Sequence, residues 1–452
     1  MAAPGVTSAS LVGWGRTNPS VAEVRQVDAA SMRVEVARCG TRGALVRGLG
    51  RSYGDAAQNA GGLVLTLAED SASPAIVGGE VTVSAGTSLD ALMRAIIPAG
   101  WFVPVTPGTR FVTVGGAIAS DVHGKNHHVD GSFGSHVSRM TLMRADGGTE
   151  VIDPSMPLFW ATVGGMGLTG AILDATVRLT PIETSRMSVN TSRIDDLDAL
   201  MDAMNADDDR FRYSVAWIDL MARGRSMGRS VLTRGDHAPL AQLDASDRDD
   251  PLGFSPRQVA SVPPLVPRQG VLNRISVAAF NEFWFRRAPR HRVDEVQSIS
   301  AFFHPLDLVG SWNRLYGARG MVQYQFVVPF GEEAAVRTVV ERLSDSRITS
   351  FLAVLKRLGA ANPAPLSFPR AGWTLALDVP ASSPGLAGLL HSLDDIVLDA
   401  GGRHYFAKDS CTTRAAIERG YPRLAEWRQV RATADPQGRW QSDLGRRLGL
   451  LD

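Results

Sequence analysis

Short apolar runs separated by glycines dominate the chain from residue 40 to residue 180. GALVRG (43–48) predicts a buried strand that ends in a glycine loop, and EVTVSAG (80–86) predicts another strand. VTVGGAIAS (112–120) and GLTGAILDATVRLTP (167–181) follow the same glycine-and-strand style. This half of the chain is therefore expected to be built from short strands and many backbone turns.

One segment of this region has helical spacing instead. SLDALMRAIIPAG (88–100) places apolar residues at helical intervals, with Ser88 as the N-cap and Gly100 just past the C-terminal end. Strands and a helix mixed in this way indicate an α+β fold rather than a regular βαβ series.

The pattern changes after Pro181. RIDDLDALMDAMNADDD (193–209) predicts an acidic, exposed helix. RYSVAWIDLM (212–221), MVQYQFVVP (321–329) and TLALDVP (374–380) predict strands of a second domain with a large antiparallel sheet.

The last part of the chain returns to the first style, beginning with RHYFAKDS (403–410). We therefore expect three parts, namely a first domain over 1–185, a second domain over 186–401, and a C-terminal segment over 402–452 that rejoins the first. A chain of 452 residues is too long for one compact core, which agrees with this division.

Residues 251–292 differ from both styles because they carry several prolines, seven arginines and a single acidic residue, Glu282. The apolar cluster FNEFWFRR (280–287) lies inside this basic segment. One interpretation is a mobile surface loop. The other is a loop that touches a lipid surface, where arginines meet phosphate and Trp284 and Phe285 enter the interface.

Overall charge and cysteine content exclude several classes of protein. The formal net charge is +1, so whole-chain electrostatics do not indicate a nucleic-acid partner, and no zinc-ligand spacing is present. Cys39 and Cys411 do not make a disulfide framework, although one bridge between them stays open. The N-terminus lacks a basic region followed by an apolar one, and no run of about eighteen apolar residues exists, so neither a signal peptide nor a membrane span is expected.

Lysine is unusually rare. Of 47 basic Lys and Arg residues only three are lysines, Lys125, Lys356 and Lys408. An ammonium group and a planar guanidinium are not interchangeable at a tight site. Each lysine retained against this arginine bias therefore marks a candidate functional position, the alternative being chance.

Two glycine-rich segments carry candidate chemistry. RGLGRSYGDAAQNAGG (47–62) allows close backbone approach to a diphosphate, but its glycine spacing fits neither a Rossmann fingerprint nor a P-loop. By itself it is as readily a structural turn as a cofactor loop. PGTRFVTVGGAIASDVHGKNHHVDGSFGSHV (107–137) groups one lysine with three histidines. A metal site is the alternative there, and the absence of an acid or cysteine inside the cluster disfavours it.

These segments together resemble a known group of enzymes. RGLGRSYGDAAQNAGG and VTVGGAIASDVHGKNHH resemble the FAD-binding half of vanillyl-alcohol-oxidase-type flavoproteins. HPLDLVGSWNRLYG (304–317), VQYQFVVP (322–329), APLSFPRAGW (364–373) and YFAKDS (405–410) resemble the decaprenylphosphoryl-β-D-ribose 2-oxidase family, the flavin subunit of an epimerase. The resemblance runs from about Gly13 to Leu450. It implies a two-lobed FAD-binding domain, a substrate domain with a large antiparallel sheet, and FAD as cofactor.

The resemblance also implies cofactor contacts. The first glycine loop of the family wraps the FAD diphosphate, and further contacts follow along the chain. The matching positions here are Val46, Arg47, Gly48, Leu49, Gly50, Arg51, Ser52, Tyr53, Gly54, Asp55, Ala56, Gly108, Thr113, Val114, Gly115, Gly116, Ser120, Asp121, Val122, His123, Ile172 and Tyr405. Related oxidases often attach the flavin to a histidine where Arg51 stands, so we predict noncovalent FAD.

Substrate contacts are implied between the flavin and the second domain. They match Tyr53, His123, Lys125, Trp217, Asp307, Arg314, Gln323, Gln325, Val354, Lys356, Thr374, Ala376 and Lys408. All three lysines fall among these positions. Mycobacterial members have Asn and Cys where Thr374 and Ala376 stand, a Tyr at Phe303 and a Phe at Leu358, which alters one wall of the pocket.

The reaction implied is oxidation of the ribose C2 hydroxyl to a keto sugar as hydride moves to the flavin, with Lys408 stabilising the reduced flavin. Tyr53, His123 and Lys408 are the candidate bases, while Lys125 and Lys356 are placed to hold the sugar or its phosphate. A partner reductase would complete epimerisation, and the family implies the periplasmic face of the cell envelope. Two alternatives stay open at this point, an alditol or sugar-lactone oxidase and a non-enzymatic FAD-binding protein.

Overall fold

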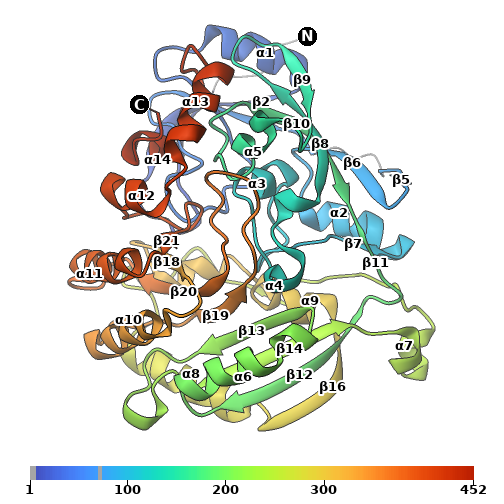
Figure 1. Ribbon diagram of the computed structural model, residues 1–452, viewed down its shortest axis with the longest axis vertical. Coiled ribbons are helices and arrows are strands. Elements are labelled where there is room, and N and C mark those ends of the chain that lie inside the picture. The colour runs from blue at the N-terminus through green and yellow to red at the C-terminus, as the bar shows by residue number, and fades with distance from the viewer. Residues whose placement is uncertain (1–6, 70–73, 452) are drawn as a thin grey trace.

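The computed structural model describes residues 7–69 and 74–451, and it divides into two halves. Two small sheets and most short helices form one half, which holds both ends of the described chain (Figure 1). A single large sheet with its covering helices forms the other half. This mixed arrangement confirms the predicted α+β class.

The two small sheets come from the first part of the chain. A four-stranded sheet has the order β1-β2-β4-β3, and a five-stranded sheet has the order β5-β6-β10-β8-β9. Their strands are β1 (Thr7–Leu11), β2 (Ser20–Val27), β3 (Ala44–Val46), β4 (Leu63–Leu67), β5 (Ile76–Val77), β6 (Glu80–Ser84), β8 (Val137–Met143), β9 (Thr149–Ile152) and β10 (Ala171–Arg178). A further pair joins β7 (Trp101–Phe102) to β11 (Thr180–Pro181).

Helices fill the space between and beside these strands. They are α1 (Ala29–Arg38), α2 (Leu89–Ile96), α3 (Val114–Ala119), α4 (His127–Asp130) and α5 (Pro157–Thr162). The expected helix at 88–100 is confirmed, because Ser88 accepts a hydrogen bond from the backbone of Ala91 and Gly100 ends the segment at φ 82°. A positive φ favours glycine, since it lacks Cβ.

Eight antiparallel strands form the large sheet, in the order β16-β12-β14-β13-β19-β20-β18-β21. They are β12 (Arg186–Ile194), β13 (Tyr213–Ile218), β14 (Ser230–His237), β16 (His291–Ser298), β18 (Met321–Val328), β19 (Ala353–Leu358), β20 (Gly372–Pro380) and β21 (Arg403–His404). The strands expected within 212–221, 321–329 and 374–380 are thereby confirmed.

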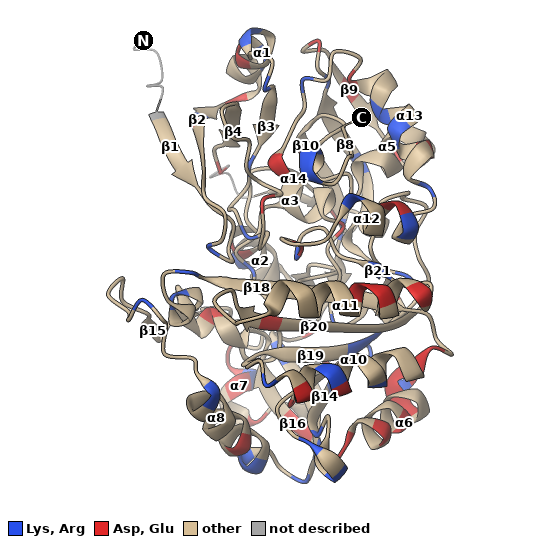
Figure 2. Cartoon of the chain, turned by 90° about the vertical axis from the view of Figure 1, so that its left-hand side faces the viewer, with Lys and Arg blue, Asp and Glu red and all other residues tan. Residues whose placement is uncertain are grey.

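Alternation along these strands separates the two faces of the large sheet. Ala216, Leu232 and Leu355 point to a core shared with three helices. Those helices are α6 (Leu197–Asp207), α10 (Glu333–Ser346) and α11 (Leu386–Asp399), and Figure 2 shows α10 and α11 running along the strands. Residues one position earlier or later face the other half of the molecule, because side chains alternate in a strand.

The C-terminal segment packs against the first half. It forms α12 (Arg414–Gly420), α13 (Leu424–Ala434) and α14 (Asp443–Arg447). Trp427 donates from its indole to the carbonyl of Ala161 at 2.8 Å, and Trp440 pairs with Ala44 beside β3. The division at residues 185 and 401 stays a prediction, and β21 adds a strand from beyond residue 401 to the large sheet.

Three local expectations need correction. The segment 112–120 does not continue the strand pattern, because Val114–Ala119 form α3 with Thr113 as N-cap. The Thr113 side chain starts this helix by accepting from the backbone N–H of Gly116, and glycine is needed at 115 because a Cβ there would lie 2.9 Å from the Cβ of Ala85. Helix α6 is acidic but not wholly exposed, because Leu200 and Met204 are buried beneath it.

The third correction concerns the basic segment 251–292, which is not a loop throughout. Arg274–Arg287 form helix α8, whose N-cap Asn273 and Ser276 make a capping box. Fourteen residues without proline or glycine follow that cap, which favours a helix. The segment also contains β15 (Ala260–Ser261), and the short elements α7 (Ala245–Arg248), α9 (Ile299–Phe303) and β17 (Val309–Gly310) lie before and after it.

Two further structural findings bear on the sequence expectations. Cys39 and Cys411 are both free thiols, so the disulfide left open by the sequence is absent from the described chain. Within residues 7–69 and 74–451, the helices are too short or too polar to span a bilayer.

Candidate active site

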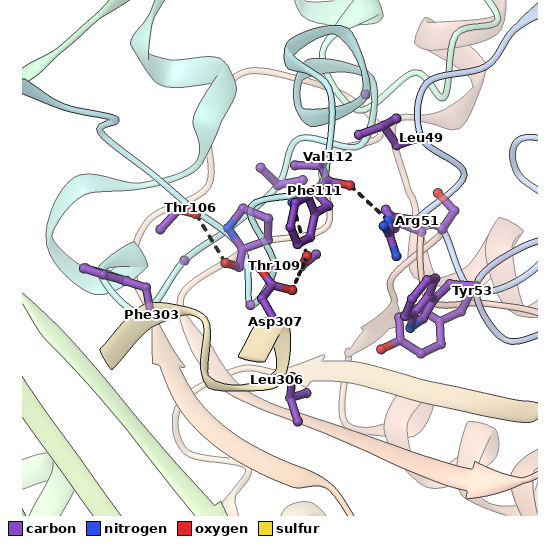
Figure 3. Close-up of a pocket in the computed structure, with 18 of the residues that line it drawn as sticks. Leu49, Arg51, Tyr53, Thr106, Thr109, Phe111, Val112, Phe303, Leu306 and Asp307 are labelled. Carbon is purple, nitrogen blue, oxygen red and sulfur yellow. Dashed lines mark hydrogen bonds between the residues drawn. The ribbon is translucent and has the colours of Figure 1, made fainter. Parts of the chain in front are cut away.

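A cavity of about 1610 Å³ lies where the glycine loops of the first half face the large sheet. A pocket for one drug-sized ligand is typically about 300–1,000 Å³, so this cavity has room for a cofactor and a substrate together. Figure 3 shows part of its lining, with Leu49, Arg51 and Tyr53 on one side and Asp307 and Leu306 facing them.

Glycines shape the wall formed by the first glycine loop. A Cβ on Gly48 would lie 2.4 Å from the hydroxyl oxygen of Thr113, and one on Gly50 would lie 2.2 Å from the guanidinium of Arg47. Gly50 also has φ 64°, which favours glycine. Glycine at both positions thus lets the loop backbone pack tightly against Thr113 and Arg47 at the wall of the cavity. This surface fits a diphosphate, and a FAD molecule would place its own there.

Most of the expected cofactor contacts line this cavity. Those that do so are Val46 to Tyr53, Ala56, Gly108, Thr113, Gly115, Gly116, Ser120, Val122, His123, Ile172 and Tyr405. Four others lie outside the lining and have structural surroundings. They are Gly54, against the backbone of Asp409; Asp55, paired with Arg447; Val114, in the hydrophobic core; and Asp121, bonded to Ser132 and Ser367.

Arg51 is the residue from which the sequence predicted noncovalent FAD. Its Nε donates to the carbonyl of Phe111 at 3.1 Å, and its guanidinium lies 4.1 Å from the ring centroid of Trp14. Burial lowers the pKa of Arg51, although a guanidinium stays charged at any working pH. Arg51 therefore supplies a positive charge to the cavity wall and no nucleophile.

Two histidines of the 107–137 segment, His123 and His127, point to different surroundings in the structure. His123 faces the cavity, where its Nε2 accepts from the side-chain amide of Gln325 at 2.9 Å. His127 turns away and accepts from the backbone N–H of Gly359 at 3.0 Å. Among residues 7–69 and 74–451, no group of three or more His, Cys, Asp or Glu side chains is arranged to hold a metal ion.

His123 is neutral in this environment. Burial, followed by the charge of Lys356, lowers its pKa well below the ordinary value of a histidine. Gln325 in turn donates to Thr374 at 3.1 Å, and the Thr374 hydroxyl donates to the carbonyl of Phe326 at 2.8 Å. This chain of hydrogen bonds fixes the imidazole against the sheet.

All three lysines line the same cavity, as the sequence implied. Lys125 donates to the carbonyl of Phe302 and lies 4.2 Å from the centroid of that ring. Lys408 lies 4.2 Å from the ring centroid of Tyr53. Lys356 projects from β19, where it lies opposite Thr374 of β20.

Burial and mutual repulsion set the charge of these lysines. Burial, followed by the charge of Lys356, lowers the pKa of Lys125 to about 7. Burial, followed by the charge of Lys408, lowers the pKa of Lys356 to about 8. Burial lowers the pKa of Lys408 to about 8, against the opposing effect of Asp378. An anionic ligand would offset this repulsion, so the cluster favours a substrate that carries negative charge.

Several expected substrate positions share the cavity with the lysines. They are Tyr53, Trp217, Asp307, Gln323, Gln325, Val354 and Ala376. Asp307 also has a structural role, because it accepts from the Thr109 hydroxyl at 2.7 Å and from the backbone N–H of Arg110 at 2.9 Å. Its two oxygens thus tie the loop of Figure 3 to the second half.

Two expected positions do not line the cavity. Thr374 is fully buried and acts through Gln325. Arg314 donates to the carbonyl of Val262 at 2.8 Å and so holds the basic segment instead.

The sequence did not identify Asp378 or the apolar residues Val215, Val231 and Phe280. Asp378 is fully buried next to Gln323, and the other three line the cavity. Alternation along 213–218 and 230–237 was the available signal, but it does not say which face of the sheet meets a ligand.

The chain has informative similarities to known proteins. Residues 19–153 match the FAD binding domain family, and residues 380–448 match the D-arabinono-1,4-lactone oxidase family. The chain is 44% identical over 456 residues, or 98% of each protein, to decaprenylphosphoryl-beta-D-ribose oxidase of Mycolicibacterium smegmatis. It is 40% identical over 369 residues to an uncharacterized protein of the mprA 5′ region of Streptomyces coelicolor, covering 80% of this chain and 100% of that protein.

Proposed function

Because the chain belongs to the decaprenylphosphoryl-β-D-ribose oxidase family, we propose that it oxidises the C2 hydroxyl of a polyprenylphosphoryl-β-D-ribose with noncovalent FAD. The product is the 2-keto sugar. This step is the first half of an epimerisation that makes the arabinose donor for cell-wall arabinan. The observation that carries the proposal is that the three lysines of the chain line the same cavity as the two glycine-rich segments.

The lysines account for recognition of the substrate. Lys125 and Lys356 both line the cavity, one from the loop after α3 and one from β19. Their positive charges suit a sugar phosphate, whose anion would raise their depressed pKa values. Free alditols lack such an anion and would leave the repulsion between the lysines in place.

FAD, when bound, supplies the two-electron oxidant that takes the hydride from ribose C2. The protein must then accept the proton of the C2 hydroxyl. Burial raises the pKa of Tyr53 far above and lowers the pKa of His123 far below their ordinary values. Of the three candidate bases, Lys408 has the pKa nearest to neutral pH, at about 8, which suits a general base. We assign the proton to neutral Lys408, whose ammonium form then stabilises negative charge beside it.

One rival function has a specific observation in its favour, the match of residues 380–448 to the D-arabinono-1,4-lactone oxidase family. This segment carries Tyr405 and Lys408, which line the cavity near the glycine loops. It does not include Lys125 or Lys356. The match therefore speaks for shared flavin chemistry more than for a shared substrate.

The surface around α8 supports contact with an anionic membrane. Leu265, Ile275 and Phe283 are 92%, 82% and 57% exposed, so large apolar side chains project from the basic segment. Basic residues lie along α8 at the end of the molecule away from the chain termini (Figure 2). Arginines with apolar neighbours are typical of a peripheral membrane surface. A lipid-linked substrate would reach the cavity from such a surface.

Completion of the epimerisation requires a second reaction. We propose a partner reductase that returns hydride to the opposite face of C2, with NADH as the natural hydride donor. We further propose that the reaction takes place at the periplasmic face of the cell envelope, where arabinan is assembled.

Flavin bleaching under anaerobic conditions tests the proposed function. Farnesylphosphoryl-β-D-ribose should bleach the flavin absorbance of the holoenzyme in a single reductive half-reaction, whereas xylitol and an aldonolactone should not. Bleaching by the alditol or the lactone with none by the lipid-linked ribose would establish the rival function. A purified chain that binds no flavin would overturn both.

A further inference from the structure

The cavity continues beyond the lysines into a chamber between the large sheet and α8. Val215, Trp217 and Val231 form its floor on β13 and β14. Phe280 and Trp284 of α8 and Phe351 form its roof. Phe280 lies 4.8 Å from Phe351 and 6.0 Å from Trp284 between ring centroids, so the roof is a continuous aromatic surface.

One row of side chains crosses the floor and joins this chamber to the reaction site. Adjacent members lie directly opposite each other on neighbouring strands, in the order Val231, Trp217, Val354, Ala376, Gln325. Gln325 holds His123 at the polar end, and the other four residues are apolar. Four strand spacings of about 4.8 Å make the row about 19 Å long.

Helix α8 covers the row and is held to the sheet by a hydrogen bond and an ion pair more than by apolar packing. Asn281 donates to buried Asp219 at 2.7 Å, and Glu282 pairs with Arg229 at 2.7 Å. Val277 is the only apolar residue of α8 that is fully buried. Phe280 and Trp284 therefore face the chamber and are not part of a packed core. A ligand in the chamber would supply the apolar contacts that these two rings lack.

A peptide does not suit this chamber. The floor lies inside a sheet, where the backbone groups of β13 and β14 already pair with neighbouring strands. A peptide would bring N–H and C=O groups that need partners, and the floor and roof side chains named above offer almost none. A hydrocarbon chain has no such requirement and gains from leaving water.

We propose that this chamber is the binding subsite for the isoprenoid chain of a lipid phosphate, which lies along Val354, Trp217 and Val231 beneath α8. This inference rests on the proposed function and adds the path of the lipid. The phosphate lies toward Lys125 and Lys356, and the chain leaves past Trp284 and Arg287, which line the outer part of the cavity.

Chain-length dependence of binding tests the subsite without catalysis. Isopentenyl, geranyl and farnesyl phosphate are titrated into the holoenzyme by calorimetry, below the concentrations at which they form micelles. Affinity should rise at least tenfold from isopentenyl to farnesyl phosphate. Equal affinities for the three would overturn the proposal, because the chain would then gain nothing from the protein.

Val231→Trp fills the far end of the row and provides the matched variant. It should remove most of the farnesyl increment while keeping the affinity for isopentenyl phosphate. Val151→Trp, at a 58% exposed valine on β9, is the control and should bind as the wild type does. Farnesyl phosphate that binds Val231→Trp with unchanged affinity would place the chain elsewhere.

A second measurement protects the test against a variant that fails to fold. A farnesyl phosphate analogue with a terminal benzophenone should cross-link wild-type protein within 228–233 or 277–288. Cross-links confined to other segments would contradict the proposal. If farnesyl phosphate binds in the chamber but farnesylphosphoryl ribose does not bleach the flavin, the proposed function fails and the subsite stands. The reverse pattern would leave the function and remove the subsite.

Discussion

Gln323 and Asp378 lie directly opposite each other on β18 and β20, and the Gln323 amide donates a hydrogen bond to the Asp378 carboxylate. The second carboxylate oxygen of Asp378 has no partner among the described residues. Burial raises the pKa of Asp378 to about 7, against the effects of Gln323 and Lys408. Asp378 is thus a buried carboxylate whose charge acts on Lys408 without a direct ion pair.

Asp378→Asn should lower the pKa of Lys408 by about one unit or more, because the substitution removes the negative charge that favours the ammonium form. Lys356 and His123 also line this cavity. Asp378 is not among the groups that shift their pKa values, so the substitution should act mainly on Lys408. Lysine labelled with carbon-13 at Cε gives one side-chain signal for each of the three lysines, so NMR titration of the holoenzyme measures the shift directly.

Asp394→Asn is the matched control for this titration. Asp394 is also buried, but it pairs with His404 and Tyr324 on the opposite side of the sheet. It should leave the pKa of Lys408 unchanged. The pH dependence of the rate of flavin reduction shows which role Lys408 has. A rate that rises with pH through the pKa of Lys408 identifies a base, and a rate that falls identifies a cation that stabilises negative charge. Either limb should move to lower pH in Asp378→Asn, and an unmoved limb would exclude Lys408 as its origin.

Lys408→Ala should slow flavin reduction by substrate about a hundredfold or more, as expected for loss of one preorganised charged group. FAD should remain bound, because the glycine wall is unchanged. Arg342→Ala, an exposed position on α10, is the control and should react at the wild-type rate. Stopped-flow reduction at saturating substrate separates chemistry from binding, and an unchanged limiting rate would remove Lys408 from the mechanism.

Acid precipitation should release all flavin into the supernatant, because Arg51 offers no nucleophile for the bond that a histidine makes to flavin in related oxidases. The absorbance of pellet and supernatant is the measurement. Yellow colour that stays with the precipitated protein would disprove noncovalent binding.

Ala376 should prevent covalent labelling by nitroaromatic inhibitors of the family, because mycobacterial members carry a thiol there and alanine has no nucleophile. Ala376→Cys should restore the adduct, since residue 376 lines the cavity opposite Gln325 and Val354. Mass spectrometry of the peptide that contains residues 374–378 is the readout. An adduct there in the wild-type protein would be incompatible with this prediction.

The basic segment should bind anionic vesicles at low salt and release them at high salt. Each arginine near an anionic surface contributes about 1 kcal/mol, and the attraction falls off over a Debye length. Replacing Arg286, Arg287, Arg290 and Arg292 by Gln should abolish sedimentation with vesicles and spare oxidation of a short-chain substrate. The control removes four exposed arginines elsewhere, Arg33, Arg342, Arg419 and Arg423. Equal loss in both variants would show a response to net charge alone.

The sequence alone predicted the class of fold. It also singled out the two glycine-rich segments and the three lysines as candidate functional positions. Local signals explain this success. Ser88 and Gly100 mark a helix by their own capping chemistry, and glycines at 48 and 50 reflect what a close backbone approach allows. The rarity of lysine among 47 basic residues indicated Lys125, Lys356 and Lys408 before any fold was known.

Only the tertiary structure decided which of these residues line the cavity. Thr374 and Arg314 lie two positions from the cavity residues Ala376 and Trp312, but they donate hydrogen bonds to backbone carbonyls of the protein. Asp378 and the row from Val231 to Gln325 depend on strand register, which joins positions more than ninety residues apart in the chain. Alternation along a strand predicts two faces, but the partner of each face is set by long-range packing, and that packing has no local signal in the sequence.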